Sequence, residues 1–267
     1  MTNLQNFFGF RREPFGPDLK VEELFQIPGL KSLVERFDYA VRLASVTVII
    51  GDVGSGKSTS LRYAVSRLHP SEYRILSLVA TSGGLLELYR QICMAFGLEN
   101  RSFSAAYLTK TLRDLFSDIV AKKQTPVLIV DEAHLLRLEV FKQLHTLAQV
   151  DFDSKALLPV ILSGQSLLID KLLYHTSRPF ASRVLGRSHL ESLNRGDMEG
   201  YLNHHLEVSG MNERLFCEEA VTAIHQGSGG LLRRANNLAK GGLLAAAREE
   251  CHVVTSEHIR LASTEIL

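Results

Sequence analysis

Residues 51–59, GDVGSGKST, have the residue types and the spacing of a loop that binds phosphate. The stretch fits the pattern G-x-x-x-x-G-K-[ST] and follows the apolar run VTVII at residues 46–50. Glycines let successive backbone N–H groups point into one concavity, and a helix that starts behind them adds partial positive charge. We therefore expect this loop to bind the phosphates of a nucleotide. The residues of the predicted loop are Gly51, Asp52, Val53, Gly54, Ser55, Gly56, Lys57, Ser58 and Thr59.

Two side chains at the end of this loop have chemistry of their own. Lys57 offers a positive charge for the β- and γ-phosphates, and the Ser58 hydroxyl is an expected ligand of Mg²⁺. The alternative is a chance match in a loop rich in glycine and serine. A predicted strand before the loop and a predicted helix after it favour the nucleotide. The expected cofactors are ATP and Mg²⁺.

A pair of carboxylates forms the second chemical feature. Asp131 and Glu132 follow the apolar run PVLIV within PVLIVDEAHLL. In open parallel sheets, ligands bind at the carboxyl ends of the strands, so these acids are expected beside the phosphate loop. Asp131 is predicted to hold Mg²⁺, and Glu132 to orient and deprotonate a water molecule. Two acids that merely cap the next helix are the alternative. A neighbouring pair, rather than a lone aspartate, favours hydrolysis over transfer to a small acceptor.

These residues must be positioned by alternating strands and helices. Such alternation is typical of an α/β fold with a parallel sheet covered by helices. The pattern becomes purely helical near residue 195, so we expect an α/β nucleotide-binding domain over residues 1–195 and a small all-α lid domain over residues 196–267. The predicted strands are 46–50, 73–80, 126–130 and 158–164. The predicted helices are 30–44, 57–68, 83–98, 104–124, 137–149, 196–210, 217–230, 231–250 and 255–266.

Composition limits the classes of function. The chain has 267 residues with 30 Lys and Arg against 29 Asp and Glu, a net charge of +1, so contact with nucleic acid would require a local basic patch. The 3 cysteines are far apart and include no CxxC pair, which suggests neither a disulfide framework nor a zinc site and fits a reducing compartment. We find no secretory signal and no apolar run of roughly 18 residues, so a soluble, cytoplasmic protein is expected.

Four segments in sequence order resemble a known family. FFGFRREPFGPD, PVLIVDEAHLL, LPVILSGQ and GSGGLLRRANNLA are similar to segments of AAA+ ATPases of the ExeA-like branch. That branch includes secretion-pathway ATPases and transposon-encoded helpers related to TnsC, TniB and MuB. The motif DEAH also occurs in helicases, but those proteins need two sheet domains and a longer chain. The resemblance covers nearly the whole sequence and implies the P-loop (AAA+) fold with its helical lid.

The resemblance implies further site residues at two positions. Ser163 or Gln165, at the end of LPVILSGQ, would be the polar sensor of the γ-phosphate, although a polar pair can also simply end a strand. Arg233 occupies the arginine position of the second sensor, where it would pair with phosphates. Leu232 replaces the proline that is usual before that arginine, so the local turn departs from the family pattern.

Other implied residues lie between protomers and near the base. SRPFASRVLGRSHL supplies an arginine that would act in a neighbouring subunit's site; Arg183 is favoured over Arg187, and Arg178 lies in the same cluster. Each of these is otherwise a surface arginine. Pro14 and Phe15 would wall the adenine pocket, while Phe15 could equally anchor a small core.

The resemblance also indicates the work that ATP hydrolysis would drive. Secretion members of the branch are longer and carry a membrane span, so we expect a stand-alone helper that assembles on duplex DNA as a ring or filament and recruits a transposase. The alternatives are an ATPase of secretion or envelope assembly and a nucleotide-dependent signalling switch. Contact with DNA phosphates would weaken steeply with salt. Candidate basic residues are Arg62, Arg67, Arg90, Lys110, Arg113, Lys122, Lys123, Arg234 and Lys240.

Overall fold

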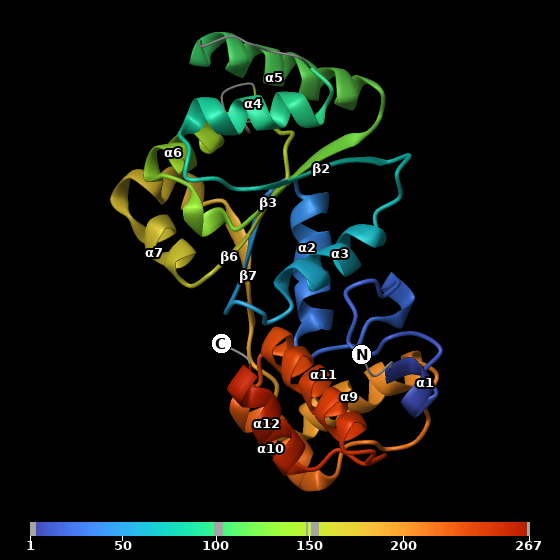
Figure 1. The fold of residues 1–267 in the computed structure, drawn as a ribbon. Coiled ribbons are helices and arrows are strands. Elements are labelled where there is room, and N and C mark those ends of the chain that lie inside the picture. Colours follow the sequence, from blue (N-terminus) through green and yellow to red (C-terminus); the bar gives the residue numbers. More distant parts are fainter. Residues whose placement is uncertain (1–3, 99–103, 148, 151–154, 266–267) are drawn as a thin grey trace. The chain divides into compact units, whose positions relative to one another are not determined.

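The computed structural model describes residues 4–98, 104–147, 149–150 and 155–265, which form two compact units (Figure 1). The sheet unit comprises Gly29–Gly51 and Lys57–Leu190. The helical unit comprises Met1–Pro28, Asp52–Gly56 and Glu191–Leu267. The phosphate loop is therefore contributed by both units along the chain. The predicted division at residue 195 stays a prediction.

A five-stranded parallel sheet organises the sheet unit. Its strand order is β2-β3-β6-β1-β7, and every neighbouring pair is parallel. This confirms the predicted parallel α/β fold. The bounds are β1 Val46–Gly51, β2 Tyr73–Val79, β3 Thr125–Asp131, β6 Val160–Gly164 and β7 Val184–Leu190, with a separate antiparallel pair of β4 Gln149–Val150 and β5 Lys155–Ala156.

Helices cover both faces of this sheet, as Figure 1 shows. On one face, α2 Leu30–Arg42 contacts β1, β6 and β7, and α3 Lys57–Ser66 contacts β1 and β6. On the other face, the large apolar core joins strand residues such as Val48 and Val130 to the remaining helices. Both faces of β1 and of the middle of β3 are buried, which explains their mostly apolar sequences. Those remaining helices are α4 Leu85–Ala95, α5 Ala105–Ala121, α6 Leu138–Leu147, α7 Leu167–Leu173 and α8 Arg178–Ala181, with the short helices η2 Ala133–Leu135 and η3 His175–Ser177.

Strand β7 is not predicted from the sequence. Its residues VLGRSHL alternate between half-buried or buried and exposed positions, and Gly186, Arg187 and His189 weaken the apolar signal. Pairing with β1 supplies the missing stabilisation, including a hydrogen bond from Thr47 Oγ1 to the Gly186 carbonyl at 3.0 Å. The strand therefore forms because a buried neighbour pairs with it from Val184 to Leu190, with a shift of register between Val46 and Thr47, which is a tertiary effect.

The described part of the chain after residue 195 is helical, as predicted. The Asn194 side chain caps α9 by accepting the Asp197 backbone N–H at 2.9 Å, and an isolated bridge joins Phe216 to Val254. No helix among the described residues has the length and hydropathy to cross a membrane. The helices of this unit are α1 Leu4–Phe8, η1 Val21–Glu23, α9 Arg195–Val208, α10 Glu218–Ser228, α11 Leu232–Arg248 and α12 Ser256–Glu265.

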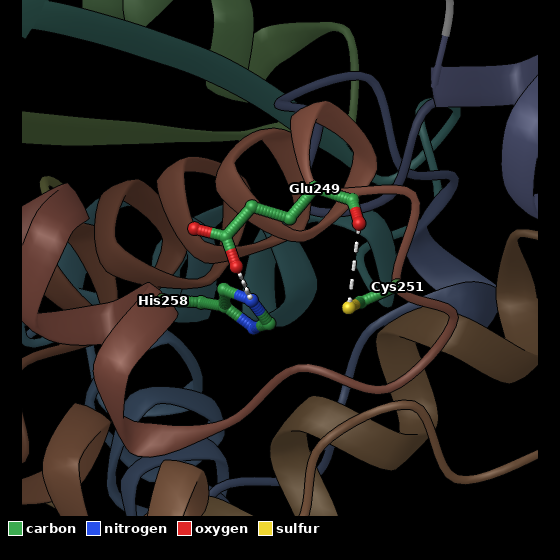
Figure 2. Close-up of side chains that lie close together, drawn as sticks. All are labelled: Glu249, Cys251 and His258. Atoms are coloured by element: carbon green, nitrogen blue, oxygen red, sulfur yellow. Dashed lines mark hydrogen bonds and ion pairs between the residues drawn. The ribbon is translucent and has the colours of Figure 1, made fainter.

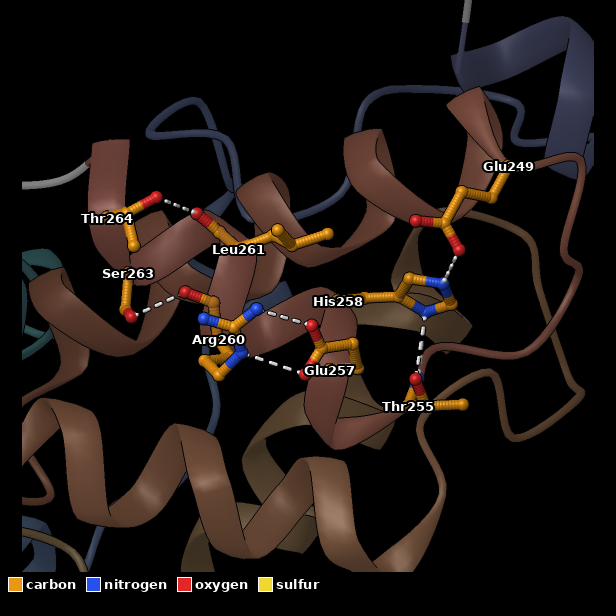
Figure 3. Close-up of polar contacts among 8 residues, drawn as sticks. All are labelled: Glu249, Thr255, Glu257, His258, Arg260, Leu261, Ser263 and Thr264. Carbon is orange, nitrogen blue, oxygen red and sulfur yellow. Dashed lines mark hydrogen bonds and ion pairs between the residues drawn. The ribbon is translucent and has the colours of Figure 1, made fainter.

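His258 links the end of α11 to the start of α12. Its Nδ1 accepts the Thr255 backbone N–H at 3.0 Å, and its Nε2 lies 3.1 Å from Glu249 Oε2 (Figure 3). The first contact satisfies an N–H group that lies just before the first turn of α12, and it places the ring proton on Nε2, which donates to Glu249. Thr255 thus lies directly before the first residue of α12, and a buried histidine accepts its N–H.

The same region contains the one group of three potential metal ligands found among the described residues. Ligand atoms of Glu249, Cys251 and His258 lie within 4.8 Å of one another (Figure 2). A metal at Nε2 would require the proton to lie on Nδ1, where it would face the Thr255 N–H. Cys251 Sγ donates to the Glu249 carbonyl at 3.5 Å. In this geometry the group is a helix-to-helix link.

The N-terminal lead-in packs on the helical unit through Phe15. This side chain is 3% exposed, stacks on His205 at 5.1 Å between ring centroids, and contacts Phe216 edge-on. Phe15 thus packs as the core anchor that the sequence allowed. His205 is buried, and its Nδ1 has no hydrogen-bond partner within the described part of the chain. Burial, and then the charges of His204, Arg12 and Lys240, lower the pKa of His205 from 6.5 to about 4.

Acid should destabilise the protein through His205. The unfolded chain takes up a proton near pH 6.5 and the folded chain only near pH 4, so this contribution is complete above pH 6.5 and is lost as the pH falls. The loss should be roughly 2 kcal/mol by about pH 5. His205→Phe keeps the ring contacts and removes the titration. Its urea midpoint should therefore change less than the wild-type midpoint between about pH 7.5 and about pH 5.

Exposed His175→Asn is the matched control and should keep the wild-type acid dependence. Equal acid losses in His205→Phe and wild type would contradict the role of His205.

Candidate active site

The phosphate loop joins the end of β1 to the start of α3. Gly54 and Gly56 have φ values of 85° and 94°, and the Ser55 N–H donates to the Asp52 carbonyl at 3.1 Å. Within the helical unit, the Gly54 carbonyl accepts the Arg233 N–H at 3.3 Å. A Cβ at Gly54 would lie 2.8 Å from the Arg233 Cβ, so only glycine fits both the dihedral angle and the space. The loop therefore has the backbone of a phosphate cradle.

The two side chains that end the loop are held by the sheet unit. Lys57 is 6% exposed and its Nζ donates to the Gly51 carbonyl at 3.0 Å. Ser58 Oγ donates to Asp131 Oδ2 at 2.7 Å. A serine hydroxyl and a carboxylate are hard oxygen donors, the kind that Mg²⁺ prefers, and here they are in direct contact. The residues present therefore fit a magnesium nucleotide.

Glu132 has an unusual backbone conformation. Its φ of 53° and ψ of 31° are left-handed, which is uncommon for a residue with a side chain. Its N–H donates to Asp131 Oδ1 at 2.9 Å, so the first acid of the pair holds the second. The Glu132 side chain is 38% exposed and open to solvent water. A strained residue beside a predicted metal site is consistent with a catalytic role.

Both candidate sensor residues lie at the end of β6. Ser163 is fully buried, pairs in register with Ile49, and its Oγ has no hydrogen-bond partner among the described residues. Gln165 is half-buried, and its side-chain nitrogen lies 3.2 Å from His134 Nε2. The structure therefore brings Gln165 to the residues that follow Glu132, while its sensor role stays a prediction.

Sequence reasoning missed His134 and Lys171. His134 is 8% exposed, and its Nδ1 lies 3.2 Å from Glu132 Oε2. The signal for it was present, since it is the histidine of DEAH. Lys171 Nζ donates to the carbonyls of His134 at 2.5 Å and Leu136 at 2.7 Å, and burial lowers the pKa of Lys171. Lys171 lies about 40 residues after the acidic pair, and no sequence pattern predicts its contact with these two carbonyls.

The candidate arginines lie on different elements. Arg183 precedes β7, and its carbonyl accepts from Val46 N–H at 3.2 Å and Ser45 Oγ at 2.6 Å. Arg187 lies within β7 in register with Val48 and is exposed, and Arg178 begins α8. A strand at the sheet edge can present such side chains to another molecule. The role of Arg183 or Arg187 in a neighbouring subunit stays a prediction.

Arg233 lies in the first turn of α11. Leu232 is the first residue of this helix, a position that favours proline but does not require it. The departure from the family's proline therefore leaves the helix start intact. The Arg233 side chain is exposed, and its pairing with phosphate stays a prediction. The adenine-binding role of Pro14 and Phe15 also stays a prediction, and both side chains are buried in the helical unit.

Comparison with known proteins agrees with this geometry. Residues 41–173 match the family model described as AAA domain. That match spans the phosphate loop, the acidic strand end and the strand end at Gly164, within a parallel sheet followed by helices. The chain has the P-loop fold of AAA+ ATPases.

A curated relative of this AAA+ chain is General secretion pathway protein A of Aeromonas hydrophila. The two are 30% identical over 263 residues, which cover 97% of this chain and 48% of the relative. The chain thus spans about half the length of that protein. Its sequence is similar to that protein over almost the whole of this chain.

Solved structures share the AAA+ fold at low identity. Cdc6p from Pyrobaculum aerophilum matches with a TM-score of 0.74 and 15% identity, covering 95% of this chain and 70% of that one. The Aeropyrum pernix ORC1 protein in complex with DNA matches with a TM-score of 0.71 and 18% identity, covering 94% and 68%. The Thermotoga maritima RuvB Holliday junction branch migration motor has a TM-score of 0.59 and 17% identity, covering 95% and 73%.

Replacing Lys57 should abolish nucleotide binding. Lys57→Ala removes the ammonium group that the Gly51 carbonyl now holds at the loop, and charged hydrogen bonds to phosphate are strong. The affinity for a fluorescent ATP analogue should fall by roughly 100-fold or more. Lys110→Ala, on the exposed face of α5, is the matched control and should bind as wild type does. Unchanged affinity in Lys57→Ala would contradict the assignment of the loop.

Proposed function

We propose that this AAA+ chain hydrolyses ATP with Mg²⁺. The observation that carries the proposal is the 2.7 Å hydrogen bond between Ser58 and Asp131, with Glu132 next in the chain. It joins the end of the phosphate loop to the acidic strand end. A kinase would also need a binding site for its acceptor, whereas water needs only a base. Glu132, open to solvent, is suited to be that base.

Each residue has a distinct task in the proposed reaction. Mg²⁺ held by Ser58 and Asp131 would neutralise charge on the phosphates. Lys57 would exchange the Gly51 carbonyl for a phosphate oxygen, a stronger partner for an ammonium group. The Glu132 carboxylate would orient a water molecule and accept its proton. Asp131 would fix the Glu132 backbone by accepting its N–H at Oδ1, while Oδ2, which now contacts Ser58, would hold Mg²⁺.

For the work that hydrolysis drives, we favour secretion or envelope assembly. The resemblance to General secretion pathway protein A extends over 97% of this chain, which supports this alternative over the transposition helper. At least three of the candidate DNA-binding residues already have partners within the chain. Arg67 lies 3.9 Å from Asp38, Lys240 lies 3.9 Å from Glu13, and Arg113 donates to the Thr146 carbonyl at 2.7 Å. Duplex DNA, a transposase and self-association stay predictions.

Replacing the proposed base should separate binding from hydrolysis. Glu132→Gln keeps the size of the side chain but cannot accept a proton. Turnover should fall by about 100-fold or more, while ATP affinity stays within about twofold of wild type. Steady-state phosphate release and analogue binding measure the two. Glu139→Gln, an exposed acid on α6, is the matched control. Turnover near wild type in Glu132→Gln would exclude Glu132 as the base.

Duplex DNA should not stimulate the ATPase if the secretion reading is correct. The rate should stay within about twofold of the DNA-free rate at low and at moderate salt, because a phosphate-based contact would appear first at low salt. Heparin serves as a non-specific polyanion control. A several-fold stimulation by DNA but not by heparin, lost as salt rises, would favour the transposition helper instead.

A further inference from the structure

We propose that His134 couples Gln165 to Glu132 by choosing between two tautomers, which makes His134 a positioning residue for hydrolysis. The proposal rests on the proposed ATPase function and on the predicted sensor role of Gln165. Its basis is the set of contacts around one buried ring, which touches the catalytic base on one side and the end of β6 on the other.

The Nδ1 atom of His134 has two competing neighbours. Glu132 Oε2 lies 3.2 Å away, and the Gln165 backbone nitrogen lies 3.4 Å away. A carboxylate oxygen only accepts a hydrogen bond, and a backbone N–H only donates one. When Nδ1 carries a proton, it therefore binds Glu132; when it does not, it binds the N–H of Gln165. A neutral ring cannot satisfy both partners, so the two contacts exclude each other.

The Nε2 atom connects this choice to the side chain of Gln165. His134 Nε2 lies 3.2 Å from the side-chain nitrogen of Gln165. A half-turn of the amide group lets it present either its NH₂ group or its oxygen to the ring. With the proton on Nδ1, Nε2 accepts from the amide NH₂. With the proton on Nε2, that nitrogen donates to the amide oxygen. The orientation of Gln165 and the restraint on Glu132 therefore change together.

A phosphate would select one of the two states. Phosphate oxygens are acceptors, so they attract the NH₂ group of Gln165 and leave its oxygen facing His134. That orientation favours the proton on Nε2. Nδ1 then uses its lone pair to accept the Gln165 backbone N–H and offers no proton to Glu132, so the carboxylate is released toward water. Tautomer exchange moves one proton off Nδ1 and one onto Nε2 through solvent, so the ring stays neutral.

The surroundings of the ring keep it in place for this exchange. Lys171 holds the carbonyls of His134 and Leu136 and so fixes the backbone of η2. Gly164 gives the ring its room, because a Cβ there would lie 3.1 Å from His134 N and 3.3 Å from His134 Nδ1. The packing thus fixes where the ring lies and leaves the position of its proton free.

The ring nitrogens report the tautomer directly by NMR. We would label histidine with ¹⁵N and assign His134 from the signal lost in His134→Gln. The protonated nitrogen should move from Nδ1 to Nε2 when a non-hydrolysable ATP analogue and Mg²⁺ are added. In Gln165→Leu, which keeps the size but lacks the amide, the proton should stay on Nδ1. One unchanged tautomer in the wild type, or a full switch in Gln165→Leu, would overturn the proposal.

Two substitutions of His134 each keep one of its two contacts and remove the other. Asparagine places its amide near the Nδ1 position and glutamine near the Nε2 position, so His134→Asn keeps a partner for Glu132 and His134→Gln keeps one for Gln165. Each should lower kcat by about 10-fold with the KM for ATP within about twofold, since networks of this kind carry coupling of about that size. Adding Gln165→Leu to either variant should then lower kcat by a smaller factor than it does in the wild type. Additive losses would overturn the proposal.

Failure of the coupling can be distinguished from failure of the ATPase proposal. Binding of the analogue is measured in the same samples, and exposed His175→Asn controls for the histidine substitution. A protein that binds and hydrolyses ATP with an unchanged His134 tautomer retains the proposed function and lacks the coupling. A protein that neither binds nor hydrolyses ATP contradicts both.

Discussion

The hydrogen bond between Ser58 and Asp131 is the contact on which the candidate site depends. It joins two residues 73 positions apart in the chain, one after β1 and one at the end of β3. These strands are not neighbours, because β6 lies between them in the order β2-β3-β6-β1-β7. All of these strands run parallel, so their carboxyl ends meet at one edge, and there the hydroxyl reaches the carboxylate. A different strand order would separate the hard oxygen donors that suit Mg²⁺.

Strand β6, which lies between β1 and β3, explains why other residues lie close to the proposed base Glu132. β6 ends at Gly164, and Gln165 follows it, beside the turn that carries Glu132 and His134. The absence of a side chain at Gly164 lets a buried imidazole approach the strand end. One sheet order thus brings together the start of α3, the acidic pair Asp131 and Glu132, and the predicted sensor residue Gln165. The left-handed backbone of Glu132 turns the chain at that meeting point.

The helical unit includes the middle residues of the phosphate loop. Residues 52–56 belong to it, and the Gly54 carbonyl accepts a hydrogen bond from the first turn of α11. Its own core, which is mostly apolar, also contains the ring of His205 packed against Phe15 and Tyr201. The group of Glu249, Cys251 and His258 has the residue types of a metal site and the hydrogen bonds of a helix cap. The positions of the protons, rather than the residue types, distinguish a metal site from a helix cap here.

The sequence alone determined the fold class, the nucleotide-binding loop and the acidic pair. Those features are local: a glycine pattern, an apolar run and two neighbouring carboxylates need no distant partner to be recognised. Only the tertiary structure supplied β7, whose weak apolar pattern is stabilised by pairing with β1, and the placement of His134 and Lys171 around Glu132. These features depend on which strands are neighbours and which atoms meet, and linear spacing does not encode either one.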